Sequence, residues 1–195
     1  MRPLKIAVLI SGNGSNLQAL LDDTNGDPHL HITLVISNNA DAYGLQRATQ
    51  AGVATMVVSH KDYSTRDAFD NALHKALTEH KIDLVCLAGF MRLLTPAFVE
   101  RWRQRMLNIH PSLLPAYKGL NTHARVLADG QKTTGCTVHY VVADMDAGPI
   151  IAQANVAVHE DDTAHSLQQR VHEAEHRLYP QALRKAAAAL PSSQS

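Results

Sequence analysis

The sequence has no excess of charge of either sign. Its 195 residues contain 18 Lys and Arg against 18 Asp and Glu, so the formal net charge is +0. Proteins that hold nucleic acid by bulk charge carry a basic surplus, because phosphate neutralisation supplies much of their affinity. The charge balance therefore argues against a nucleic-acid partner, although a few placed groups could still hold a small anionic ligand.

Cysteines and long apolar runs are also scarce. The only two cysteines, Cys86 and Cys136, stand far apart in apolar runs, which predicts buried, reduced thiols and a cytoplasmic location. No segment reaches the roughly 18 consecutive apolar residues that a membrane-spanning helix needs. The apolar run near the amino end breaks at Ser11, before it could form the core of a signal peptide. We therefore expect no membrane partner.

Short, β-branched apolar runs alternate with helical patterns through the first half of the chain. The strand-like runs cover residues 4–10, 31–37, 53–58 and 82–88, and the helical patterns cover residues 15–23, 43–51 and 64–80. Near-continuous apolar strands that alternate with helices are typical of parallel sheets covered on both faces. We therefore predict the α/β class, with a Rossmann-like, doubly wound, mostly parallel sheet and helices on both of its faces.

The second half follows a different pattern. A fifth strand begins at Met106, followed by a proline-punctuated loop, a short helix near residues 121–129, strand-like runs over 133–142 and 150–158, and a last helix over about 163–188. No linker or repeat interrupts the chain, so residues 1–195 are expected to form a single domain. Within it we distinguish residues 1–105, residues 106–188 and a frayed tail over residues 189–195.

Ligands of such sheets bind beyond the carboxyl ends of the strands. The segment SGNGSNL, residues 11–17, follows the first strand and leads into the first helix. Its glycines allow a tight turn that exposes backbone N–H groups, and the helix amino terminus adds Ser15, Asn16 and a positive dipole end. The segment predicts a phosphate cradle, with a plain capped turn as the alternative. It matches neither the dinucleotide-binding motif nor the P-loop.

Polar residues at the end of the fifth strand point to chemistry. Asn108 and His110 alternate with period two, so both project from the same face of the strand. An amide donor beside an imidazole suits stabilisation of an oxyanion, and a satisfied structural pair is the alternative. Asp144 and Asp146 precede Gly148-Pro149 in a loop between two strands, and a solvated turn is the alternative. A carboxylate near the imidazole would favour its charged form and fix its tautomer.

Two further segments are less specific. The turn LAGFMRLL, residues 87–94, has Arg92 as its one charged residue and by itself indicates a packed turn. HEAEH, residues 172–176, matches the H-E-x-x-H zinc signature. Helical spacing places both of its histidines away from the apolar stripe, and no third ligand follows, so we expect solvent-facing histidines and no metal. The same spacing lets Glu175 reach into a cleft.

Taken together, the motifs resemble the folate-dependent formyltransferases. They are LISGNGSNLQALL, SNNADAYGLQRA, LAGFMRLL, NIHPSLLPAYKGLNTH and DMDAGPI, in that order, within residues 6–180. NIHPSLLP followed by an Asp-containing DAGP loop is specific to that family, and SGNGSNL is similar to its phosphoribosylglycinamide formyltransferase branch. The resemblance implies the formyltransferase fold. It also implies transfer of a formyl group from 10-formyltetrahydrofolate, a co-substrate, to the amine of glycinamide ribonucleotide (GAR) in purine biosynthesis, without a metal.

The resemblance also implies roles for individual residues. The positions that match the catalytic trio are Asn108, His110 and Asp146; those that match GAR contacts are Gly14, Ser15, Asn16 and Glu175; and those that match folate contacts are Arg66, Met91, Arg92, Leu93, Leu94, Asn108 and Asp144. Residues 1–105 would then be the nucleotide- and phosphate-binding half, and residues 106–188 the catalytic and folate-binding half. Both partners would be small molecules, and a monomer or a homodimer is expected.

Some features depart from the family pattern, and three other interpretations of the function stay open. His172 stands where Gln is common, Lys118 stands where Pro or Arg is common, and the carboxyl terminus looks short. A methionyl-tRNA formyltransferase would need a basic RNA-binding domain. A formyltetrahydrofolate hydrolase would need a regulatory domain before the first strand, which is expected to begin at Leu4. A non-catalytic nucleotide-binding module would explain SGNGSNL but would give the catalytic trio no task.

Overall fold

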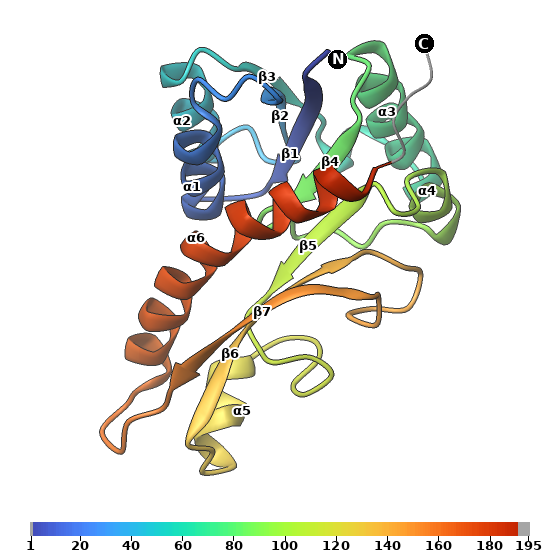
Figure 1. Ribbon diagram of the computed structural model, residues 1–195. Helices are drawn as coiled ribbons and strands as arrows, with labels where there is room; N and C mark the ends of the chain where they lie inside the picture. The colour runs from blue at the N-terminus through green and yellow to red at the C-terminus, as the bar shows by residue number, and fades with distance from the viewer. Residues whose placement is uncertain (1, 191–195) are drawn as a thin grey trace.

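A seven-stranded sheet with the order β3-β2-β1-β4-β5-β6-β7 forms the centre of the molecule (Figure 1). The structure is a computed structural model that describes residues 2–190. The strands are β1 (Leu4–Ile10), β2 (Leu30–Ser37), β3 (Ala54–Val57), β4 (Leu84–Leu87), β5 (Met106–His110), β6 (Thr133–Tyr140) and β7 (Ile150–Ala157). The first five strands pair in parallel, whereas β6 and β7 are antiparallel. The predicted mostly parallel α/β sheet is confirmed.

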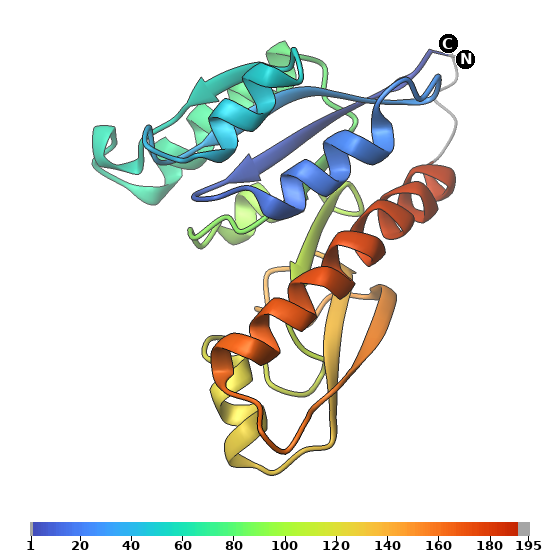
Figure 2. The ribbon, with the colours of Figure 1, turned by 90° about the vertical axis from the view of Figure 1, so that its left-hand side faces the viewer.

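Helices cover both faces of this sheet. They are α1 (Ser15–Thr24), α2 (Gly44–Gln50), α3 (Arg66–Glu79), α4 (Pro96–Arg101), α5 (Thr122–Ala128) and α6 (Ala164–Ala189), with a 3-10 turn over His60–Asp62. One apolar cluster packs α1, α2, α5 and α6 against one face, and a second packs α3 and α4 against the other. Figure 2 shows α1 and α6 on the same side of the sheet, where they are in contact. Burial on both faces explains why the central strands consist of nearly continuous apolar residues.

The long helix α6 connects the two ends of the sheet. It crosses the sheet and contacts α1, β6 and β7 (Figure 1). A capping box formed by Thr163 and Ser166 fixes where it begins. Towards its other end, the buried Tyr179 hydroxyl donates to the Leu87 carbonyl oxygen at 2.8 Å. The helix is therefore anchored to β4, and Glu175 lies one turn earlier on α6.

The structure differs from the sequence-based predictions at two helices. The sequence analysis does not predict α4, although Thr95 caps its first turn and Pro96 occupies an early position that favours a helix start. Ala189 belongs to α6, so the tail predicted over residues 189–195 does not begin there; residues 191–195 lie outside the described residues. Across residues 2–190, none of the helices has the length and apolar character that crossing a bilayer requires.

Candidate active site

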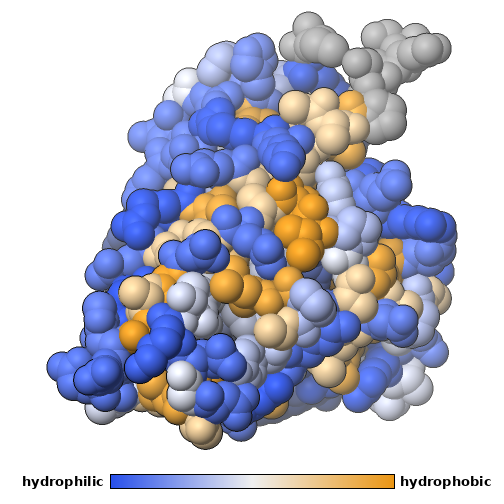
Figure 3. All heavy atoms as spheres, turned by 60° about the horizontal axis from the view of Figure 1, so that its bottom comes forward, coloured by the Kyte–Doolittle hydropathy of each residue, from blue (hydrophilic) through white to orange (hydrophobic). Residues whose placement is uncertain are grey.

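The loops that follow β1, β4 and β5 lie together at the carboxyl edge of the sheet. These strands are neighbours, and the strand order reverses between β1 and β4, where open α/β sheets bind ligands. The Met91 backbone N–H donates to the Ser11 hydroxyl oxygen at 2.8 Å and so joins the first two loops. Figure 3 shows apolar side chains gathered within a hydrophilic surround on the face turned forward. The predicted site segments therefore meet at one edge.

Two backbones approach closely to shape the SGNGSNL loop. Gly14 caps α1 with φ +76°, and a Cβ atom on it would lie 2.7 Å from the Cα atom of Gly44. The Gly44 N–H in turn donates to the Gly12 carbonyl oxygen at 3.0 Å. Arg47 braces the loop from α2 by donating to the backbone oxygen and the side-chain oxygen of Asn13. The first N–H groups of α1 are thereby held at the sheet edge, where an anion could accept from them.

Asn16 and Glu175 meet where α1 faces α6. Asn16 Nδ2 donates to Glu175 Oε2 at 3.0 Å, and only 4% of Glu175 is exposed. Burial raises the pKa of Glu175 to about 7, although the hydrogen bond from Asn16 opposes the shift. Glu175 is thus buried between α6 and α1. The Asn16 backbone N–H lies in the first turn of α1, where it can donate to a phosphate.

His110 stands at the end of β5 with an oxygen atom at each ring nitrogen. Its Nε2 donates to the Tyr117 carbonyl oxygen at 2.8 Å, and its Nδ1 lies 3.5 Å from Asp146 Oδ2. The side chains of His110 and Asp146 are only 8% and 9% exposed. The Nδ1 separation exceeds that of an ordinary hydrogen bond. Since Nε2 is bonded to the Tyr117 carbonyl oxygen, Nδ1 is the ring nitrogen that faces the Asp146 carboxylate.

Asp146 reaches His110 because the loop between β6 and β7 folds back over the strands. Asp146 adopts a left-handed backbone conformation with φ +53°, and its Oδ2 accepts from the Gly119 N–H at 2.9 Å. Gly148 passes so close to β6 that a Cβ atom there would collide with the Tyr140 carbonyl oxygen. Glycine at position 148 is therefore required by a close backbone approach as well as by the turn.

His139 is a member of this cluster that the sequence analysis missed. It faces Asn108 across the β5–β6 pair, with its Nε2 3.3 Å from Asn108 Nδ2 and 3.9 Å from Asp146 Oδ1. Burial is the main cause that lowers the pKa of His139, and the nearby His110 acts in the same direction. The backbone hydrogen bond at Tyr140 and the charge of Asp146 oppose this shift. The only signal in the sequence was a histidine within an apolar strand.

The residues predicted to contact folate, apart from Asn108, occupy three segments. They are Met91, Arg92, Leu93 and Leu94 after β4, Arg66 at the start of α3, and Asp144 between β6 and β7. Met91 and Leu93 are 71% and 59% exposed, which leaves large apolar side chains uncovered beside the SGNGSNL loop. Arg66 and Asp144 also have exposed positions. The structure thus joins the turn after β4 to the site and places the other two residues on the surface.

The two histidines of HEAEH are partly buried, which corrects the expectation that both face solvent. The rings of His172 and His176 stack with centroids 6.3 Å apart, and burial is the main cause that lowers the pKa of each. Helices α1 and α5 flank α6 and cover more of it than the apolar stripe alone. Within residues 2–190, no group of three or more His, Cys, Asp or Glu side chains is arranged to hold a metal ion.

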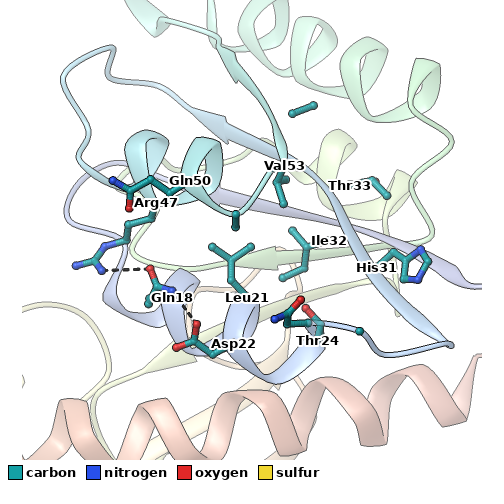
Figure 4. A pocket seen from close by; sticks show the side chains of 15 residues that line it. Gln18, Leu21, Asp22, Thr24, His31, Ile32, Thr33, Arg47, Gln50 and Val53 are labelled. Atoms are coloured by element: carbon teal, nitrogen blue, oxygen red, sulfur yellow. Dashed lines mark hydrogen bonds between the residues drawn. The ribbon is translucent and has the colours of Figure 1, made fainter.

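A surface hollow of about 880 Å³ lies between α1, α2 and β2 (Figure 4). Its polar side chains bond to one another: Gln18 donates to Asp22 at 2.8 Å and accepts from Arg47 at 3.3 Å. Because Arg47 also braces the SGNGSNL loop, its position in the hollow has a structural explanation. The hollow therefore gives no reason to move the candidate site from the carboxyl edge of the sheet.

Comparison with protein families agrees with this geometry. The family described as Formyl transferase matches residues 4–183. This chain belongs to the formyl transferase family. The resemblance inferred from the order of the motifs is confirmed, and the fold that it implies is shared with solved structures of the family.

Relatives of this family member include separate enzymes and parts of longer proteins. Phosphoribosylglycinamide formyltransferase of Escherichia coli is 47% identical over 179 residues, which are 91% of this chain and 84% of that protein. The crystal structure of phosphoribosylglycinamide formyltransferase from Brucella melitensis has a TM-score of 0.92 and 46% identity, covering 99% of this chain and 100% of that one. The Bos taurus trifunctional purine biosynthetic protein adenosine-3 is 54% identical over 180 residues. The chain covers 92% of its own length in that match but only 18% of the trifunctional protein.

Proposed function

We propose that this chain transfers the formyl group of 10-formyltetrahydrofolate to the amine of GAR, in the biosynthesis of purines. The observation that carries the proposal is the partly buried cluster of Asn108, His110 and Asp146 at the carboxyl edge of the sheet, beside a loop suited to anions. Relatives that match the chain over most of both lengths are named phosphoribosylglycinamide formyltransferase.

The SGNGSNL loop and α6 would hold GAR. Its phosphate would accept from the backbone N–H groups of Gly14, Ser15 and Asn16, because these lie at the amino terminus of α1. Glu175, on the facing side of α6, would contact the remainder of GAR. On this proposal the even net charge poses no difficulty, since local donors meet the phosphate.

The chemistry would take place at the end of β5. The GAR amine attacks the formyl carbon and forms a tetrahedral intermediate with a negatively charged oxygen. Charged His110 and the Asn108 amide stabilise that oxygen, because fixed donors act strongly in a buried site. Asp146 favours the charged ring and positions a water that carries a proton from the amine to the leaving folate nitrogen. The bond between the formyl carbon and that nitrogen then breaks.

The turn after β4 would form the folate side of the site. Met91 and Leu93 offer exposed apolar surface next to the SGNGSNL loop, whereas Arg92, the one cation, and Leu94 are partly buried. Arg66 and Asp144 are exposed and would meet the outer parts of the folate. Both substrates are small molecules, and no metal enters the proposed steps.

The decisive experiment follows the absorbance of folate released from 10-formyltetrahydrofolate, with and without GAR. Release that depends on GAR, with formyl-GAR as the product, is the expected result. Release without GAR would instead indicate a hydrolase. A folded protein that binds GAR without turnover would contradict the proposal and favour a nucleotide-binding module.

A further inference from the structure

The hydrogen bond from His139 to its own strand fixes its tautomer. His139 Nδ1 lies 3.0 Å from the Tyr140 carbonyl oxygen. Because a carbonyl oxygen can only accept, the hydrogen must be on Nδ1. The residue is 2% exposed, and burial favours the neutral ring. A neutral ring with its hydrogen on Nδ1 carries a lone pair on Nε2.

That lone pair determines how the Asn108 amide is turned. Asn108 and His139 are directly opposite in the antiparallel β5–β6 register, and the contact at 3.3 Å joins Nε2 to the Asn108 side chain. A lone pair can accept from the amide nitrogen but would repel the amide oxygen. Asp146 Oδ1 is 3.9 Å from Nε2, too far to compete. The amide nitrogen has two hydrogens, so one binds His139 and the other stays available.

We infer that His139 is a positioning residue that keeps the available Asn108 N–H directed at the oxygen of the transferred formyl group. This inference rests on the proposed function. Without an acceptor at position 139, the amide could turn over and present its oxygen, which would repel the negative charge of the intermediate. His139 thus acts through Asn108 and contacts neither substrate.

Substitutions that keep or remove the acceptor test this role. His139→Phe keeps a ring but removes the lone pair, whereas His139→Gln retains an oxygen that can accept from Asn108. We expect His139→Phe to lower kcat by about 10- to 100-fold, a smaller loss than the roughly 100- to 1000-fold loss from deleting a donor. The KM for GAR should stay within about twofold of the wild-type value. His139→Gln should recover most of the lost kcat.

A double-mutant comparison separates positioning from independent catalysis. In an Asn108→Ala background, His139→Phe should cause less than about a twofold further loss of kcat, because its effect passes through the missing amide. Equal losses in both backgrounds would overturn the inference. So would a folded His139→Phe variant with the wild-type kcat.

Nuclear magnetic resonance of the wild-type protein gives a test that needs no variant to fold. With ¹⁵N-labelled histidine, His139 should show a protonated Nδ1 and an unprotonated Nε2 at neutral pH. A charged ring or the opposite tautomer would overturn the inference. Absence of GAR-dependent transfer by the wild type would instead contradict the proposed function, so the two failures are distinguishable.

Discussion

Substitutions of the cluster residues Asn108, His110 and Asp146 should lower activity without destabilising the core. None of Asn108, His110 and Asp146 belongs to the two apolar clusters that hold the helices against the sheet. We expect alanine at each position to lower kcat by about 100- to 1000-fold, because each removes a donor or the charge that supports one. Steady-state kinetics and thermal unfolding measure the two effects.

The exposed His29 provides a matched control for these variants. His29→Ala should leave kcat unchanged. Near-wild-type turnover in a variant of the cluster would remove that residue from the mechanism. For Asp146, an additional Asp146→Asn variant keeps an acceptor for the Gly119 N–H and removes only the charge.

Glu175 should make the stability of the protein depend on pH. Its folded pKa is about 7 against an ordinary value of 4.5, so the folded state keeps a proton that the unfolded state releases. Stability is therefore lost as the pH rises from 4.5 through 7. Glu175→Gln removes this loss and should be more stable than the wild type by up to about 3 kcal/mol near pH 8.

Urea unfolding across this pH range measures the difference. The advantage of Glu175→Gln should shrink towards zero near about pH 5, where wild-type Glu175 is protonated in the folded state. An equal advantage at both ends of the range would show that Glu175 is not the source. The exposed Glu173→Gln is the matched control, and no such trend is expected for it.

The sequence identified some residues of the cluster and not others for a geometric reason. Asn108 and His110 are two positions apart on one strand, so their shared face follows from strand geometry. His139 joins them only through the antiparallel register that places it opposite Asn108. Register depends on packing and loop geometry far along the chain. The bond from Asn16 to Glu175 likewise depends on how α1 and α6 pack.

At the scale of elements, the stability of the turn between β1 and α1 should depend more on Gly14 than on Gly12. Gly14 has φ +76°, and its missing Cβ would meet Gly44, whereas a Cβ on Gly12 would meet nothing within 4 Å. Gly14→Ala should therefore lower the free energy of unfolding by more than about 1 kcal/mol, because strain and collision add. Gly12→Ala should change it by less than about half of that. Equal losses in chemical denaturation would contradict this account.

Elements were predictable where burial leaves a periodic pattern. The parallel strands are buried on both faces, so their sequences are short apolar runs. The apolar stripe of α6 predicts the first residue of that helix to within one residue. The helix α4 has only six residues, too few to show a periodic pattern. The partial burial of His172 and His176 depends on the neighbours α1 and α5, which a single-helix pattern does not include.

At the scale of the whole molecule, the two predicted halves share one sheet. Strand β4, in residues 1–105, pairs with β5, in residues 106–188. Helix α6 belongs to the second half, yet it packs on α1, and Tyr179 donates to Leu87 of the first half. The candidate site is assembled from both halves, with the SGNGSNL loop after β1 and with Asn108 and His110 in β5. A site of this kind requires that the halves keep a fixed arrangement.

Unfolding should therefore be a single transition for both halves. Trp102 is the only tryptophan, lies just after α4 and is 2% exposed, so its fluorescence reports the first half. Far-ultraviolet circular dichroism reports all helices, including the long α6. We expect the two urea midpoints to coincide. Tyr179→Phe should lower both urea midpoints together and reduce the free energy of unfolding by about 1 kcal/mol, because it removes a hydrogen bond that joins the halves. A Trp102 transition that shifts independently of the dichroism would show that residues 1–105 and 106–188 unfold as separate domains.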